Sequence, residues 1–314
     1  MTQRFNDAAV TSTGAFFIGE LERLDQTLYE PIIDTTWSRD IDLRSDVTAA
    51  DEVSSFIVSN YAGGFSGTSN GGKSWISVSG NTPARVSVSN EKKMQPLTPW
   101  GMIVSYTVLE LMKAQQAGRP IDAQKYNAMK MKHQLDIDAQ VYVGDKELGV
   151  KGLLNNDDEV MAHNIGQFDP TASAKSVIEQ FNGVLDKAWK ATNYTRLPTN
   201  ILVPPSVFAS LVSTQLPNTS MNLLNFVLEN SLTKANGNEL TIAPCKWLAS
   251  EDFFDKPRIV AYTKKEDVVR FPLVQLQSLP VQYNQFEQSV PYFGAMGAVE
   301  FVRPEMVFYG VLAN

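Results

Sequence analysis

The chain has 314 residues, enough for one large domain or two ordinary ones, and its 43% hydrophobic and 19% charged residues exclude a disordered polypeptide. The formal net charge is -7, and no basic cluster is longer than a lysine pair such as Lys92-Lys93. These features exclude a protein that binds nucleic acid through many phosphate contacts. One cysteine (Cys245) and two histidines (His133 and His163) exclude an internal disulfide and a zinc cluster. We expect Cys245 to be a small buried hydrophobe in a reducing compartment.

The N-terminal part of the chain predicts a detached amphipathic helix. Residues 15–29 place four large apolar side chains at helical spacing, and Glu30-Pro31 ends the helix. An extended stretch, residues 32–43, separates this helix from the later core. We therefore expect an arm that packs on a neighbouring subunit through Phe17, Leu21, Leu24 and Leu28. No run of about eighteen apolar residues occurs, so we expect no membrane span.

Residues 59–97 begin rich in Gly, Ser and Asn and then alternate between apolar and polar side chains. A three-residue loop at Ser79-Gly80-Asn81 would pair Val78 with Thr82 and Ile76 with Ala84, which puts the apolar side chains on one face. This pattern predicts a long β-hairpin with a contacting face of Ile76, Val78, Ala84 and Val86.

The same region also contains a nucleotide-binding pattern. Residues 67–74 match G-x-x-x-x-G-K-[ST] at every fixed position. Such a loop needs a helix that begins at Lys73, so that backbone N–H groups face the phosphates. A β pattern follows Lys73 instead, so we favour the hairpin and keep a P-loop NTPase as an alternative.

Two helices are predicted next. The first spans residues 104–116, with Val104, Val108 and Leu111 on one stripe. The second is a longer helix that opens at Pro120 and ends before Gly144. Its predicted apolar stripe consists of Ala128, Met131, Leu135, Ala139 and Tyr142. A glycine-punctuated turn over residues 144–155 follows.

The remaining chain divides into two kinds of pattern. Residues 165–266 alternate helices and strands, with an amphipathic helix through Val177 and Trp189 and strands at Asn200–Val203, Leu240–Ala243 and Ile259–Tyr262. Residues 268–314 are strand-like throughout. We expect their sheet to pack on the long helix, which makes that domain discontinuous in sequence. The fold class is α+β.

No catalytic, cofactor-binding or metal-binding constellation is found in the sequence. Asp136 and Asp138 lie about 200° apart on the long helix, so they are interpreted as solvated or interface charges rather than a carboxylate pair. His133 and His163 have no nucleophile or acid partner in a recognisable arrangement and are interpreted as structural. We expect no enzyme activity.

The order of these elements resembles the major capsid proteins of tailed phages of the Hong Kong 97 type. The segments that carry the resemblance are 17–31, Gly118-Arg119-Pro120-Ile121-Asp122, the turn from Gly144 to Asn156, and Ile201-Leu202-Val203-Pro204. The resemblance implies an N-terminal arm (1–43), an extended loop (59–97), and a peripheral domain (44–58, 98–164 and 267–314) with a spine helix (121–143). It also implies an axial domain (165–266).

The function implied by the resemblance is a shell subunit that forms hexamers and pentamers of itself. Such a head is assembled in the host cytoplasm and encloses DNA as non-specific contents; a scaffolding protein, a portal and a decoration protein are its implied partners. No scaffolding-like segment precedes the arm, so we expect a separate scaffold or none. The covalent cross-link of the founding member is not carried over, since only Lys73 or its neighbours can be aligned to it. An encapsulin-type compartment, or another virion protein, is the alternative within structural proteins.

Overall fold

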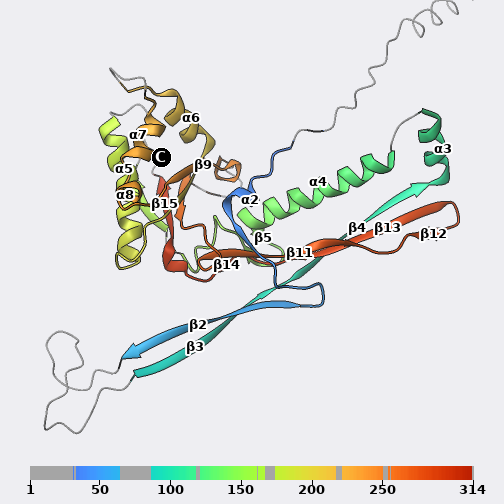
Figure 1. The fold of residues 1–314 in the computed structure, drawn as a ribbon, viewed down its shortest axis with the longest axis horizontal. Helices are drawn as coiled ribbons and strands as arrows, with labels where there is room; N and C mark the ends of the chain where they lie inside the picture. Colours follow the sequence, from blue (N-terminus) through green and yellow to red (C-terminus); the bar gives the residue numbers. More distant parts are fainter. Residues whose placement is uncertain are drawn as a thin grey trace, which may run out of the picture. The chain divides into compact units, whose positions relative to one another are not determined.

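The computed structural model describes residues 31, 33–63, 86–117, 121–160, 162–166, 174–216, 221–249, 254 and 256–312. The chain divides into two compact units, Met1–Asp34 and Thr35–Asn314. All elements described below belong to the second unit. It combines helices with a six-stranded sheet, a five-stranded sheet and two two-stranded sheets (Figure 1). The expected α+β class is confirmed.

A two-stranded antiparallel ribbon is formed by β2 (Val53–Gly63) and β3 (Val86–Pro96). Its pairing runs from Val53–Pro96 to Gly63–Val86 without a shift. β2 and β3 thus form one antiparallel ribbon in the region where a hairpin is expected, and the ribbon begins at Val53, before the expected start at residue 59. The expected pairs of Val78 with Thr82 and of Ile76 with Ala84 lie outside the described residues. In the described part of the ribbon, Val86 pairs with Gly63 and Val88 with Tyr61.

The six-stranded sheet combines segments from both ends of the chain. Its strands are β1 (Asp42–Arg44), β4 (Thr98–Thr107), β11 (Val269–Ser278), β12 (Gln282–Asn284), β13 (Glu287–Met296) and β14 (Glu300–Phe301). β13 pairs with β4 along the whole of β4, and β11 pairs with both β13 and β14. The long helix α4 (Ile121–Tyr142) covers this sheet, with Met129, Ile137 and Val141 buried. The expected packing of C-terminal strands on the long helix is confirmed.

The buried stripe of α4 differs from the predicted one. Every fourth residue from Met129 through His133 and Ile137 to Val141 is buried, whereas Ala128 is exposed and Met131 and Leu135 are half-buried. The buried stripe includes a histidine, and Asp138 beside it is also buried, so apolar periodicity selected the wrong face.

The helix expected at residues 104–116 begins later. β4 continues to Thr107, and α3 spans Val108–Ala117. Glu110 N donates to Thr107 Oγ1 (3.2 Å), and Thr107 N donates to the Glu110 carboxylate (3.1 Å). This reciprocal pair is a capping box, which sets the start of the helix at Val108. Val104 is buried in the strand rather than placed on a helical stripe.

The turn after α4 is confirmed as glycine-dependent. Two short strands, β5 (Gly144–Asp145) and β6 (Val150–Lys151), pair there, and Gly144 has a positive φ of 73°. A Cβ at Gly152 would lie 2.4 Å from the backbone carbon of Tyr142. Only glycine permits this close return of the chain to the end of α4.

The five-stranded sheet has the order β7-β15-β10-β8-β9. Its strands are β7 (Ala162–Gly166), β8 (Asn200–Val203), β9 (Thr241–Pro244), β10 (Arg258–Tyr262) and β15 (Val307–Leu312). The helices of this region are α5 (Ala174–Ala191), α6 (Pro205–Ser213), α7 (Leu223–Glu229) and α8 (Leu232–Ala235). Phe181 and Leu185 of α5 pack against Ile201 and Ile259 of the sheet in one core. The predicted helices and strands of residues 165–266 are confirmed within these bounds.

The expectation that all strands after residue 268 form one sheet is wrong for β15. It pairs antiparallel with β10 and parallel with β7, so it lies between two strands of the five-stranded sheet. Its side chains alternate between two cores: Tyr309 packs with the α4 cluster and Phe308 with the α5 cluster. A strand that is buried on both faces belongs inside a sheet, and only the five-stranded sheet has helices on both sides of it to provide that burial.

Candidate assembly surface

The two faces of the β2–β3 ribbon differ in what they contact. Opposite residues in an antiparallel pair share a face, so the pairing of β2 with β3 assigns each side chain to one of the two faces. The face that includes Ser54, Phe56 and Lys93 turns toward the rest of the same chain: Lys93 Nζ binds Glu159 (3.0 Å), and the Arg270 guanidinium lies 5.8 Å from the centre of the Phe56 ring. We call this the inner face.

The opposite side of the ribbon, here called the outer face, consists of residues 53, 55, 57, 59, 61 and 63 paired with 96, 94, 92, 90, 88 and 86. Four large apolar side chains on it are exposed: Val53 (49%), Ile57 (66%), Val88 (55%) and Met94 (63%). Soluble surfaces seldom align so many exposed apolar side chains in one stripe, which marks an interaction surface.

The base of the ribbon is tied to the six-stranded sheet by the buried carboxylate of Glu300. It accepts hydrogen bonds from Ser54 Oγ of β2, from Arg44 Nη1 (3.1 Å) and from Arg270 Nε (2.6 Å). Arg44 also binds the exposed Asp46 through two nitrogen atoms, and these hydrogen bonds raise the pKa of Arg44 and lower the pKa of Asp46. The two guanidinium groups compensate the buried charge of Glu300.

A second polar cluster anchors residues 36–40, near the end of the predicted arm (1–43). Asp138 of α4 accepts hydrogen bonds from the backbone N–H groups of Thr36 (2.9 Å) and Trp37 (3.2 Å), at the start of the short helix α2 (Trp37–Asp40). Its other oxygen accepts from Trp247 Nε1 (2.9 Å) and binds Lys246 Nζ (2.8 Å). Asp138 is fully buried, so its interpretation as a solvated charge is wrong.

Asp40 completes this cluster. Its carboxylate accepts from the Tyr142 hydroxyl and binds the Arg39 guanidinium (2.7 Å). Burial, together with the negative charge of Asp40, raises the pKa of Tyr142 above its ordinary value, so the hydroxyl stays a donor. The Tyr262 hydroxyl donates to the Asp40 backbone oxygen (2.6 Å). Residues 36–40 are thereby attached to both α4 and β10.

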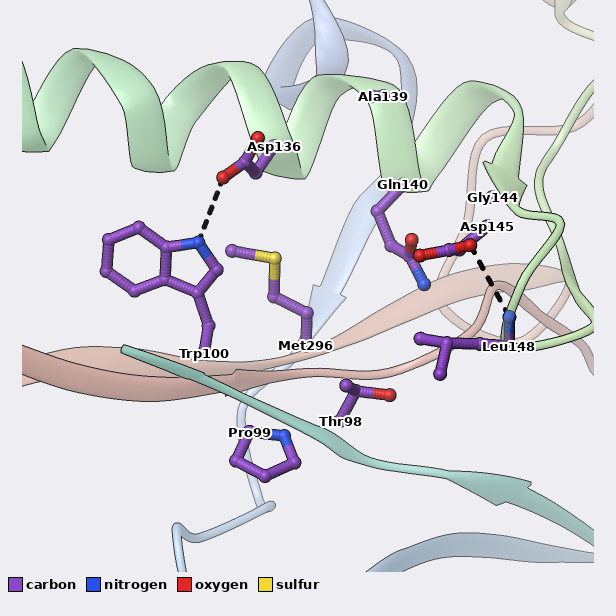
Figure 2. Close-up of a pocket in the computed structure, with 10 residues that line it drawn as sticks. All are labelled: Thr98, Pro99, Trp100, Asp136, Ala139, Gln140, Gly144, Asp145, Leu148 and Met296. Atoms are coloured by element: carbon purple, nitrogen blue, oxygen red, sulfur yellow. Dashed lines mark hydrogen bonds between the residues drawn. The ribbon is translucent and has the colours of Figure 1, made fainter. Parts of the chain in front are cut away.

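An open pocket of about 290 Å³ lies where the C-terminal half of α4 meets β4 and the glycine turn (Figure 2). Trp100 and Met296 project from the sheet, while Asp136 and Gln140 descend from α4. Trp100 Nε1 donates to Asp136 (2.9 Å). The lining residues are Thr98, Pro99, Trp100, Asp136, Ala139, Gln140, Gly144, Asp145, Leu148 and Met296.

The predicted interface residues fall largely outside the described part of the chain. Phe17, Leu21, Leu24 and Leu28 of the arm, and Ile76, Val78 and Ala84 of the hairpin, all lie there, as does the 67–74 pattern. Only the backbone of Val86 is described, at the end of β3 on the outer face.

Sequence reasoning missed Val53, Ile57 and Met94. The signal that could have found β2 is its content of β-branched and aromatic residues (Val53, Phe56, Ile57, Val58) just before the glycine-rich stretch.

Other predicted residues are placed as follows. Cys245 is fully buried, which confirms it as a small core residue, and burial raises its pKa to about 12. His133 is buried with its ring 4.6 Å from Trp100, and His163 stacks on Phe308 at 5.0 Å. Among the residues that the structure describes, no three acidic, histidine or cysteine side chains are grouped as metal ligands would be.

Comparison with known proteins decides what this architecture is. The sequence profile of a family described as "Major capsid protein" matches residues 71–310. The chain belongs to the major capsid protein family. No curated protein matches its sequence. A major capsid protein is a component of the virion, and no helix in the described ranges is long and apolar enough to cross a membrane.

Solved capsid structures share the fold at low sequence identity. The capsid of Myoviridae phage XM1 has a TM-score of 0.76 and 14% identity, over 94% of this chain and 98% of that one. The capsid of a native GTA particle has a TM-score of 0.62 and 9% identity, over 99% and 100%. The structure from Mycobacterium phage Ogopogo has a TM-score of 0.58 and 9% identity, over 96% and 99%. The fold is of the Hong Kong 97 type, as the sequence predicted.

Proposed function

We propose that the chain assembles as hexamers and pentamers of itself into an icosahedral head that encloses a phage genome, and that it does so as a structural protein without catalysis. The observation that carries the proposal is the exposed apolar stripe on the outer face of the ribbon. At the base of the ribbon the inner face contacts its own chain through Phe56 and Lys93, so the outer face is the side available there to another subunit.

The arrangement of the ribbon supports this proposal energetically. Among the described strands, β2 and β3 pair only with each other, and an isolated two-stranded ribbon is marginally stable in water. Covering its apolar face with a neighbouring subunit would contribute roughly 1.5–3 kcal/mol for each large side chain that becomes fully buried. The ribbon is therefore expected to gain its final stability on assembly.

The division into arm, extended loop, peripheral domain and axial domain remains part of the proposal, with two changes. Residues 307–312 join the sheet of the axial domain, and residues 53–58 join the extended loop. A phage head is favoured over an encapsulin-type compartment by the phage capsids of the same fold. A scaffolding protein, a portal and a decoration protein are the partners that such a head would use.

The test combines the purified full-length chain with two paired variants. The wild type, with a scaffold where one is required, should form shells visible by electron microscopy. Ile57→Asp with Met94→Asp places two charges on the outer face and should abolish shells while the subunit stays folded. Asn60→Asp with Ser89→Asp, the matched control on the opposite face, should still assemble.

A wild-type chain that remains monomeric under all such conditions would contradict the proposal. Magnesium-dependent ATP binding by the wild type, lost in Lys73→Ala, would instead favour the P-loop alternative.

A further inference from the structure

The outer face of the ribbon carries a single charge. Lys92, which pairs with Ile57, is its only charged residue. The next lysine along the strand, Lys93, lies on the inner face and binds Glu159 of the same chain. Lys92 therefore points away from its own chain, is exposed, and forms no ion pair within the described residues. Exposed apolar side chains flank it, Ile57 directly opposite and Met94 two residues along.

The pocket between α4 and the sheet complements the outer face, because it combines apolar surface with negative charge. Trp100, Met296 and Leu148 give it apolar surface, and Leu148 at its rim is 51% exposed. Two carboxylates also line the pocket. Asp136 is neutralised by Lys132 and by the Trp100 N–H, but Asp145 accepts only backbone N–H groups from Glu147 (2.8 Å) and Leu148 (3.4 Å). Asp145 forms no ion pair within the described ranges, so its carboxylate is free to accept a cation (Figure 2).

The size and polarity of the pocket indicate side chains rather than a small ligand. Ligand sites usually occupy about 300–1,000 Å³ and place a few convergent polar groups around the ligand. Here the volume is about 290 Å³, Asp136 and Gln140 already have side-chain partners within the chain, and the Asp145 carboxylate has only backbone donors. One or two inserted side chains, at least one of them cationic, fit this description.

We infer that the pocket of one subunit receives the outer ribbon face of a second copy, with Lys92 of one copy paired to Asp145 of the other. Met94 and Ile57 then cover the apolar rim around Leu148. The inference rests on the proposed function, because it names the surface that the ribbon contacts. The apolar contacts supply attraction, while the single charge pair sets the register, since any other placement leaves Lys92 against apolar surface.

A charge exchange between the two surfaces tests this pairing. Lys92→Glu places a negative charge against Asp145 of the second copy, and Leu148→Lys places a positive charge against Lys92. Neither substitution alters a side-chain hydrogen bond within the described chain. Each should raise the protein concentration needed for shell formation by about tenfold. The double variant restores opposite charges and should assemble within about threefold of the wild type. Asp145→Asn, which keeps the turn acceptor and removes the charge, should weaken assembly in the same direction as the single variants.

Lys175→Glu, a reversal at an 85% exposed position in α5, is the matched control and should assemble as the wild type does. Melting temperatures near the wild-type value show that each variant is folded. Single variants that assemble normally, or a double variant no better than the singles, would overturn the pairing and leave shell assembly itself intact. Failure of the wild type to form shells would overturn the proposed function instead.

Discussion

Asp138 is buried in the middle of a helix, and its carboxylate accepts three hydrogen bonds and forms one ion pair. The donors come from Thr36, Trp37, Lys246 and Trp247, about a hundred residues away on either side in sequence. A carboxylate without such donors would not remain charged inside the protein. The sequence around Asp138 does not indicate these distant groups. For that reason Asp138 was predicted to be a solvated or interface charge.

His133 makes the stability of the subunit depend on pH. Its ring is buried beneath Trp100, and within the described residues its Nε2 has no hydrogen-bond partner. Burial lowers the pKa of His133 in the folded chain, against the opposing charge of Asp136. The unfolded chain therefore binds a proton first, at about pH 6.5, and the free energy of unfolding falls as the pH decreases from there to the folded-state pKa.

His133→Phe keeps a ring against Trp100 but cannot titrate. The decrease in melting temperature between about pH 7.5 and pH 5 should be smaller in this variant than in the wild type. The measurement is thermal unfolding across that range. An equal slope in both proteins would show that His133 does not contribute.

At the scale of elements, Glu300 fixes the base of the ribbon. Replacing it with Gln removes the buried negative charge that Arg44 and Arg270 share and leaves each of them only its exposed carboxylate partner, which should lower the free energy of unfolding by about 3 kcal/mol. Amide hydrogen exchange in β2 and β3 should rise as well, because the hydrogen bond of Ser54 to a charged carboxylate becomes a weaker one to a neutral amide. Asp46→Asn is the matched control: it removes the exposed partner of Arg44 and should cost about 1 kcal/mol or less. Equal costs for the two variants would contradict the anchoring role.

The elements differ in how well the sequence predicted them, for a physical reason. α4, α5 and the strands at β8, β9 and β10 were predicted, because each buries an apolar face inside the same chain. β2 was missed, since Val53 is followed by two serines, Ile57 lies between Phe56 and Val58 without a period of two, and both Val53 and Ile57 are exposed. β4 was mistaken for the start of α3, because Val104, Val108 and Leu111 also fit a helical spacing. The capping box at Thr107 and Glu110 was the local signal that places the boundary.

The candidate surface was predicted only in kind. The sequence indicated a hairpin with one apolar face, but β2 pairs with β3 between residues that are 23 to 43 positions apart (Gly63 with Val86, Val53 with Pro96), and no local pattern specifies this pairing. The pocket combines Trp100, Asp136, Asp145 and Met296 from four segments, so it could not be inferred before the fold was known.

At the scale of the whole molecule, we expect residues 36–40 to contribute to the stability of the subunit and the residues before them to contribute to assembly. The contacts of Asp138 and Asp40 attach residues 36–40, near the end of the predicted arm (1–43), and the predicted arm helix lies before them at residues 15–29. Deleting residues 1–30 should therefore leave the melting temperature of the subunit close to that of the full chain, while shell formation is lost. Calorimetry and electron microscopy measure the two effects. An insoluble, unfolded truncation would show that Phe17, Leu21, Leu24 and Leu28 belong to the subunit's own core.

The position of β15 has a consequence for synthesis in the cell. β15 lies between β7 and β10, which are made earlier, and contributes Tyr309 to one core and Phe308 to the other. A nascent polypeptide therefore cannot close this sheet until residues 307–312 have left the ribosome. A polypeptide that stops before residue 307 lacks an interior strand and an aromatic side chain in each core, so we expect it to be a substrate for proteolysis rather than a shell subunit.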